Sequence, residues 1–211
     1  MGQKVNPISL RLGEFYTWNS LWYANKQDFK KVLLEDLKLR QFLLKRLNLA
    51  GITGVRIERS INKIRITIQV TRPGMVIGRG GSGLEELKKS LCQLVAIPEP
   101  EKNLEIRTEE VKNPDLSSLY VARWISEQLQ KRMPHRHLVK KTIERTMSAG
   151  AKGIKIVLSG RINGAEIARR ERFAKGKVPL QTLRAKIDYA DYPSLTRSGY
   201  IGVKVWICTQ D

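Results

Sequence analysis

One short stretch constrains the fold of this chain more than any other: residues 78–83 read Gly-Arg-Gly-Gly-Ser-Gly. Glycines at this density mark a loop between regular elements. Because glycine has no Cβ, such a loop lets the backbone of another molecule approach the main chain closely. Arg79 adds a positive charge that can donate hydrogen bonds to phosphate. The stretch therefore predicts a loop that holds a polyphosphate backbone.

Two known motifs fit this loop. Gly78 and Gly81 frame the G-x-x-G of a KH domain, which clamps single-stranded nucleic acid. Gly78, Gly80 and Gly83 also spell the G-x-G-x-x-G of a dinucleotide site. A dinucleotide site needs a strand that runs directly into its first glycine. Here a Pro-Gly pair at residues 73–74 separates the preceding strand from the loop, so we favour nucleic acid.

The elements predicted around the loop agree with a KH domain. Apolar residues three and four apart predict a helix over residues 27–49, and alternating apolar residues predict strands around 55–57 and 64–70. Three elements follow: a short helix at 73–77 begun by a proline, a helix at 82–95 and a strand at 104–107. This order matches the prokaryotic (type II) KH arrangement. A sharp turn between two helices, with no ligand, remains the alternative.

Positive charge is concentrated in one quarter of the chain. The 211 residues carry a formal net charge of +19 at pH 7. Residues 131–186 hold 16 Lys and Arg against 3 Asp and Glu, a net of +13, whereas residues 61–130 hold 10 against 9. Charge at this density needs an anionic partner, because it otherwise repels itself. Nucleic acid is the usual partner; a membrane surface, which would need a basic helix with a broad apolar face, is the alternative.

The composition disfavours several other classes of protein. No apolar run is long enough for a transmembrane helix, and the N-terminus lacks the apolar core of a signal peptide. The two cysteines, Cys92 and Cys208, have no metal-ligand spacing and suit a reducing compartment. His135 and His137 suggest a metal by spacing, but no third ligand lies near them in the sequence. We therefore expect no metal, no cofactor and no membrane partner.

Residues 1–25 are expected to form an irregular N-terminal arm. The arm is rich in aromatic residues: Phe15, Tyr16, Trp18, Trp22 and Tyr23. Interleaved with Lys4, Arg11 and Lys26, these rings could stack on bases. The alternative is that they pin the arm onto the fold, and the sequence leaves both interpretations open.

A boundary at Asn113-Pro114-Asp115 separates a KH unit, residues 26–112, from a second unit, residues 113–211. In the second unit we expect helices at 116–131 and 138–149 and a strand through Ile154, Ile156 and Leu158. Short strands at 178–188 and 199–208 would complete a small mixed or antiparallel sheet. The whole chain is thus predicted to be α+β.

Two basic clusters in the second unit are candidate nucleic-acid surfaces. Arg136 and Lys140 lie four residues apart on one helix face, and Lys141 and Arg145 form a second such pair. The opposing face offers a packing stripe: Val139, Ile143, Thr146 and Met147. A basic ridge on a packed helix holds a backbone without reading bases.

The second basic cluster surrounds three turn glycines, at positions 160, 164 and 176. Its members are Arg161, Arg169, Arg170, Arg172, Lys175 and Lys177. The alternative for this segment, a solvated charged helix, would need compensating acids, and only Glu166 and Glu171 are present. We therefore interpret the cluster as an RNA surface.

Further segments resemble one family. Met-Gly-Gln-Lys-Val-Asn-Pro at 1–7, followed by Leu-Arg-Leu-Gly at 10–13, resembles the start of bacterial-type small-subunit ribosomal protein three. Residues 160–169, Gly-Arg-Ile-Asn-Gly-Ala-Glu-Ile-Ala-Arg, resemble the C-terminal signature of that family. Segments at 150–155, 178–185 and 202–207 fit it too. The resemblance runs along essentially the whole chain in order, with a KH loop where the family has one.

The resemblance implies a structural, non-enzymatic protein of the small-subunit head, which lines the channel where mRNA enters and helps to guide and unwind it. It places the family's three basic mRNA positions on Arg136, His137 and Lys140. Arginine is usual at the position of His137, and histidine is largely neutral at pH 7. The ridge therefore lacks a permanent charge and a bidentate phosphate interaction there. The KH loop contacts expected from the glycine motif fall on Gly78, Arg79, Gly80 and Gly81.

Ribosomal RNA contacts are expected in the arm and in the second cluster: Lys4, Arg11, Arg161, Asn163, Arg169, Arg170, Arg172, Lys175 and Lys177. The resemblance further implies neighbouring proteins of families ten and fourteen in the head and of families four and five at the channel. The setting would be a cytoplasmic ribosome, bacterial or of a bacterial-type organelle. Two rivals are a free-standing KH RNA chaperone and a nucleotide-dependent enzyme. The +13 segment argues against the first, and the lack of a P-loop lysine or triad candidate argues against the second.

Overall fold

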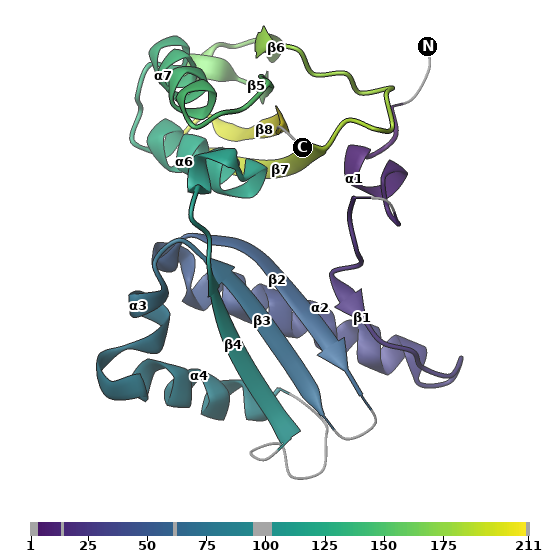
Figure 1. The fold of residues 1–211 in the computed structure, drawn as a ribbon. Coiled ribbons are helices and arrows are strands. Elements are labelled where there is room, and N and C mark those ends of the chain that lie inside the picture. The colour runs from purple at the N-terminus through teal and green to yellow at the C-terminus, as the bar shows by residue number, and fades with distance from the viewer. Residues whose placement is uncertain (1–3, 14, 61–62, 95–102, 210–211) are drawn as a thin grey trace. The chain divides into compact units, whose positions relative to one another are not determined.

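The computed structural model describes residues 4–13, 15–60, 63–94 and 103–209. The chain divides by its contacts into two units: Trp18–Lys112 form one, and the described residues up to Thr17 join those from Asn113 onward in the other. The elements of both are labelled in Figure 1. Within the described ranges, no helix is both long and apolar enough to cross a membrane.

The first unit, residues 18–112, has the predicted element order from its first long helix onward, with one short strand before it. Its elements are β1 (Ser20–Leu21), α2 (Phe29–Arg46), η1 (Asn48–Ala50), β2 (Ile52–Arg59), β3 (Ile64–Val70), α3 (Pro73–Ile77), η2 (Arg79–Gly81), α4 (Ser82–Cys92) and β4 (Leu104–Glu110). The strands form one sheet in the order β1-β2-β3-β4. The β2–β3 pair is antiparallel, whereas β1–β2 and β3–β4 are parallel. A mixed sheet with this connectivity is no doubly wound dinucleotide fold.

Helices α2 and α4 pack on one face of this sheet (Figure 1). The alternation that predicted β3 places Ile64, Ile66 and Ile68 on the buried face, each at most 1% exposed. Leu39 and Leu43 of α2 pack against them, four residues apart on one helix face. The core therefore holds the short α3 and the glycine loop at one end of the sheet.

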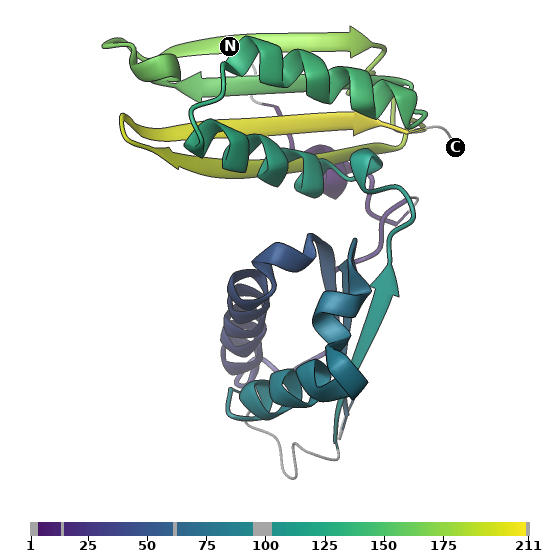
Figure 2. The same ribbon diagram turned by 90° about the vertical axis from the view of Figure 1, so that its left-hand side faces the viewer.

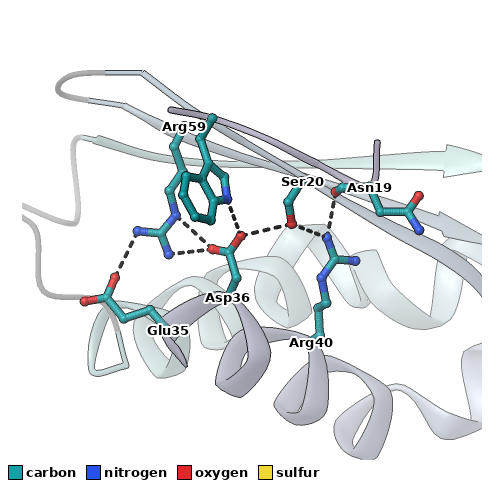
Figure 3. A network of polar contacts seen from close by, with 7 residues as sticks. Asn19, Ser20, Glu35, Asp36, Arg40 and Arg59 are labelled. Atoms are coloured by element: carbon teal, nitrogen blue, oxygen red, sulfur yellow. Dashed lines mark hydrogen bonds and ion pairs between the residues drawn. The ribbon is translucent and has the colours of Figure 1, made fainter. Parts of the chain in front are cut away.

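A buried carboxylate fastens the start of this unit to α2 (Figure 3). Asp36 is 2% exposed, and its Oδ2 accepts hydrogen bonds from Ser20 Oγ at 3.0 Å and Trp22 Nε1 at 2.7 Å. Its Oδ1 accepts from Arg59 at 2.8 Å. Trp22 also packs against Phe29, with ring centroids 5.4 Å apart. Trp22 therefore pins the chain onto the fold, which was one of the two interpretations of the aromatic cluster. Trp18 and Tyr23 are exposed.

The second unit is also α+β. Its elements are α1 (Pro7–Leu10), η3 (Pro114–Leu116), α6 (Ser118–Gln130), α7 (His135–Ser148), β5 (Gly153–Gly160), η4 (Ile162–Gly164), β6 (Arg169–Gly176), β7 (Ile187–Thr196) and β8 (Gly199–Cys208). The four strands form a fully antiparallel sheet in the order β6-β5-β8-β7. Helices α6 and α7 lie across one face of this sheet, as Figure 2 shows, and bury its main apolar core.

The opposite face of this sheet is covered in part by irregular chain. Val157, Trp206 and Ile187 form a second, smaller cluster there, against which Val178 and Leu180 pack. Strand β5 is accordingly buried on both faces over residues 153–158. The face away from the helices thus combines an apolar centre with the basic residues described below.

Two expectations from the sequence need correction. Residues 1–25 are not wholly irregular, because α1 and β1 lie within them. The strand expected at 178–188 begins only at Ile187, the first residue of β7. In the segment before it, backbone carbonyls accept hydrogen bonds from Arg11 and not from a neighbouring strand. The cluster at 161–177 is also not the solvated charged helix that the sequence analysis had rejected, because β6 pairs in register with β5 from Arg169 onward.

Candidate RNA interfaces

The KH loop joins α3 to α4, and its glycines divide into two kinds. A Cβ on Gly78 would lie 2.8 Å from Gly83 N, and one on Gly83 would lie 2.7 Å from Val76 O. These two glycines therefore allow the helices to pack closely. Gly80 and Gly81 have positive φ angles of 61° and 88° but open space where a Cβ would stand. Their backbone is the part of the loop that a ligand can reach.

Arg79 and the N-terminal end of α4 lie beside this open backbone. The first turn of α4 has no side-chain cap; the Ser82 N–H donates to Arg79 O, and the positive end of the helix dipole points to the loop. Arg79 is exposed within the loop. The arrangement suits a phosphate backbone lying across Gly80 and Gly81. The same geometry also suits a turn that only joins two helices, so nucleic-acid binding by this loop stays a prediction.

Helix α7 presents a basic ridge, made of Arg136, His137 and Lys140, which are all exposed. The opposite side of the helix is buried as the spacing predicted: Val139 is 0%, Thr146 0% and Ile143 8% exposed. Arg136 and Lys140 form no ion pair with another described residue. Their charges are therefore available to a partner.

The second basic pair predicted on α7 is only half available. Lys141 is exposed, but Arg145 donates to Asp115 Oδ1 at 3.1 Å. The Arg145 guanidinium also lies over the ring of Trp124, 5.0 Å from its centroid. A cation held by a carboxylate and an aromatic face stabilises the packing of α6 and α7. Arg145 therefore belongs to the fold and not to the ridge.

His135 is not a surface group like His137. It is 3% exposed; its Nε2 lies 2.9 Å from Glu171 Oε2, and its Nδ1 lies 3.2 Å from Asn163 Oδ1. Burial raises the pKa of Glu171, but the hydrogen bond from His135 and the charge of Arg169 outweigh it and hold that pKa below the usual value. Among the described residues, no cluster of three or more His, Cys, Asp or Glu side chains could hold a metal ion. His135 instead ties the start of α7 to β6.

Strand β6 is an edge strand whose exposed cations face both ways. Arg170, Arg172 and Lys175 are exposed and form no ion pair within the described chain, whereas Arg169 donates to Glu171 at 2.9 Å. Charged residues also protect an edge strand from pairing with other chains. Phe173 packs against the helix-side core opposite Ile156. The strand is therefore fixed in place by its apolar member and leaves its cations outward.

The structure corrects the assignment of Arg11 as an RNA contact. Arg11 is 1% exposed. Its guanidinium donates to the carbonyls of Ala185 at 2.7 Å, Thr182 at 2.8 Å, Leu180 at 3.0 Å and Pro7 at 3.0 Å. A side chain so enclosed cannot reach a nucleic acid. Arg11 is a structural cation that holds the segment before β7.

Comparisons with known proteins bear on both units. The model of the KH domain matches residues 38–116, and the model described as "Ribosomal protein S3, C-terminal domain" matches residues 125–207. A protein of Clostridium novyi (strain NT) named small ribosomal subunit protein uS3 is 47% identical over 207 residues, which is 98% of this chain and 92% of the relative. This chain belongs to the uS3 family.

Other members of the uS3 family are equally similar. The uS3 protein of Shouchella clausii (strain KSM-K16) is 48% identical, over 98% of this chain and 92% of its own length. That of Finegoldia magna is 49% identical, over 98% of this chain and 83% of its own length. The resemblance noted in the sequence is thereby confirmed, as is the α+β fold with a KH domain followed by a C-terminal domain of this family.

Sequence reasoning missed a basic residue of this uS3 chain in β5. Lys155 is 6% exposed, its Nζ lies 4.7 Å from the ring centroid of Trp206, and it has no acidic partner among the described residues. Burial lowers the pKa of Lys155, and the nearby charges of Lys4, Arg172 and Arg170 lower it further. A lysine inside an otherwise apolar run was the available signal. Only the strand register shows that Lys155 lies beside Trp206 of β8 and next to β6, which carries several other cations.

Sequence reasoning also missed Arg132, which ends α6. Its backbone N–H donates to Leu129 O, and Met133 N–H donates to Gln128 O, the pattern of a Schellman turn. Arg132 has φ of 60° at the position that glycine usually takes, which costs about 1 kcal/mol for a residue with a side chain. Asn163 in η4, with φ of 56°, is the other residue besides glycine that has positive φ in the described chain.

Proposed function

We propose that this protein is a structural, non-enzymatic component of the small ribosomal subunit, where it binds small-subunit ribosomal RNA and lines the channel where mRNA enters. Membership of the uS3 family supports the ribosomal setting. The observation that carries the RNA-binding part is the exposure of unpaired cations on α7 and β6 of one unit. Backbone binding by such cations is electrostatic and independent of sequence.

Within this function, the two units take different parts. The KH loop clamps an RNA backbone at Gly78, Arg79, Gly80 and Gly81, with Gly80 and Gly81 as the surface of closest approach. Ribosomal RNA lies on Lys4, Arg161, Asn163, Arg169, Arg170, Arg172, Lys175 and Lys177. Asn163 shares its amide with His135, so it contributes mainly through the shape of η4.

The α7 ridge guides mRNA. Arg136 and Lys140 hold phosphates along one helix face, while His137 between them adds no permanent charge. Unwinding by this ridge is accordingly weaker than with arginine at that position, because histidine cannot bind a phosphate with two parallel hydrogen bonds. Replacing His137 with arginine would supply that interaction. Passage of structured mRNA would then be faster in ribosomes that carry the variant.

The proposed partners follow from this placement. They are small-subunit ribosomal RNA, mRNA, head proteins of families ten and fourteen, and channel proteins of families four and five. The proposed location is a cytoplasmic ribosome, in a bacterium or a bacterial-type organelle.

Crosslinking of RNA to the protein in cells, with the crosslinked peptides mapped, tests the proposal. We expect small-subunit ribosomal RNA on peptides from residues 161–177 and mixed mRNA on peptides from 136–141. Crosslinks confined to a narrow set of transcripts at residues 78–81, with no ribosomal RNA, would instead indicate a regulatory KH protein and would overturn the proposal.

A further inference from the structure

The second unit contains a hollow that lies outside the KH loop and the α7 ridge. It forms where three connections meet at one end of the antiparallel sheet: the α6–α7 turn, η4 and the β7–β8 turn. In Figure 2 these connections lie together at the left-hand end of the sheet coloured green to yellow. The hollow has a volume of about 630 Å³, within the range of sites that hold small ligands.

Each connection contributes one exposed arginine to the hollow. Arg132 comes from the α6–α7 turn, Arg161 from the residue before η4, and Arg197 from the β7–β8 turn. Arg161 donates through Nε to Ala165 O at 2.8 Å, which orients its guanidinium. The side chains of Arg132 and Arg197 have no hydrogen bond or ion pair with other described residues. No Asp or Glu lines the hollow. Three uncompensated guanidinium groups around one space favour an anion.

The inner wall of the hollow is apolar. Leu129 and Ile201 are buried beneath it, and Met133, 38% exposed, lies at its side with Pro134. A site with cations at its rim and apolar atoms on its wall matches the two halves of a nucleotide, a phosphate and a base face. It suits inorganic phosphate less well, because phosphate would leave the apolar wall unused.

The hollow also connects to the α7 ridge. A second hollow of about 240 Å³ is lined by Arg136 and Arg169, and shares Pro134 and Asn163 with the first. Cations therefore continue from Arg197 past Arg132 to Arg136. A chain of phosphates can follow this line without crossing an acidic residue that lines either hollow.

We propose that the hollow binds one nucleotide of an RNA strand, with Arg132, Arg161 and Arg197 on its phosphates, and that the strand continues onto Arg136 of the α7 ridge. This inference rests on the proposed function that the protein binds RNA. It adds Arg132 and Arg197 to the residues that contact the strand. The strand can come from mRNA or from ribosomal RNA, since both offer the same phosphates and bases.

The unusual backbone at Arg132 provides a variant whose effects on stability and binding have opposite signs. Arg132→Gly removes the guanidinium and also places glycine where φ is positive, so the variant should be more stable than the parent. Binding of fluorescein-labelled oligouridine by the full-length protein should nevertheless weaken about tenfold, with a further weakening for Arg132→Gly/Arg197→Gln. The slope of log affinity against log salt should fall by about 0.7 for each phosphate that the variant no longer binds.

Lys131→Gln is the matched control, because it removes one neighbouring positive charge that does not line the hollow. It should change oligouridine affinity much less than Arg132→Gly does. If the parent protein binds oligouridine and both arginine variants bind it equally well, the inference is overturned while the proposed function stands. If the parent binds no RNA at all, the proposed function fails, and the inference fails with it.

Photo-crosslinking in reconstituted small subunits identifies the source of the strand. Thiouridine-labelled mRNA joined to peptides containing Arg132 or Arg197 would support the inference with mRNA as occupant. Crosslinks of ribosomal RNA to the same peptides would support it with ribosomal RNA. Crosslinks to α7 with none from either RNA to these peptides would overturn it.

Discussion

Two buried ions show what single residues do in this fold. Arg11 and Asp36 each lie at a point where an irregular segment meets a regular element, and each satisfies several polar groups at once. Neither ion can contact RNA, because each is at most 2% exposed. Both should therefore affect stability, and neither should affect binding directly.

Arg11→Met should lower the free energy of unfolding by about 3 kcal/mol, because it leaves several buried carbonyls without their charged donor. Urea denaturation of the full chain measures this loss. Arg184→Met, which removes an exposed arginine from the segment that Arg11 holds, should cost less than about 0.5 kcal/mol. Unchanged stability of Arg11→Met, with weakened RNA binding, would restore Arg11 as an RNA contact.

Asp36→Asn should also be destabilising, by about 3 kcal/mol, because it removes the charge of the more buried of the two carboxylates that hold Arg59, the other being Glu35. Thermal and urea denaturation would both detect the loss. Asp28→Asn offers a matched control on the same helix region. Asp28 pairs with Lys31 at 3.7 Å, but its side chain is 59% exposed, so its loss should cost at most about 0.5 kcal/mol. Equal effects of the two substitutions would contradict this account of Asp36.

At the scale of elements, the central feature is the joint between α7 and β6. His135 and Glu171 connect α7, which carries the basic ridge, to β6, which carries the cations proposed to bind ribosomal RNA. Arg169 donates to the same carboxylate at 2.9 Å. The relative position of two basic surfaces therefore depends on one partly buried acid.

Glu171 should contribute stability that is lost in acid. Because its pKa in the folded protein lies below the usual value, its contribution is complete above that usual value and disappears as pH falls through the lowered one. The loss can reach about 1.4 kcal/mol per pH unit for one proton. Urea denaturation between about pH 6 and pH 3 should show a steeper decline for the parent than for Glu171→Gln. The stability of the exposed Glu166→Gln variant should decline like that of the parent. If the stability of Glu171→Gln also declines like that of the parent, folding does not lower the pKa of Glu171.

At the scale of the whole molecule, the uneven charge decides how RNA binding responds to salt. The chain carries +19, of which +13 lies in residues 131–186. Each phosphate contact adds about 0.7 to the salt slope for a single strand. The second unit should therefore dominate the salt dependence of RNA binding by the complete protein.

The triple variant Arg170→Gln/Arg172→Gln/Lys175→Gln should lower the slope of log affinity against log salt by about 2. Removing the same charge from exposed positions of α2, with Lys30→Gln/Lys38→Gln/Lys45→Gln, should lower it much less. Fluorescence anisotropy with an RNA oligonucleotide over a range of salt concentrations measures both slopes. Equal slopes for the two triple variants would show that net charge matters and its placement does not.

The sequence by itself determined the features that depend on neighbours along the chain. The short helix at 73–77 and the glycine loop follow from a proline, a run of glycines and their spacing, and the structure confirms both. The buried side of α7 follows from residues three and four apart, because helix periodicity is local. The same spacing placed Arg136 and Lys140 on one face of the helix, whereas His137 joined them only through the resemblance to the family.

Only the tertiary structure decided which cations are buried, paired or brought together. Arg11 and Arg136 look alike in the sequence, yet one bonds carbonyls near residue 180 and the other faces solvent. The hollow takes its arginines from positions 132, 161 and 197, which meet only because the sheet aligns three connections at one end. The physical reason is that burial and electrostatics depend on distance in space, and sequence periodicity carries no information about contacts between distant segments.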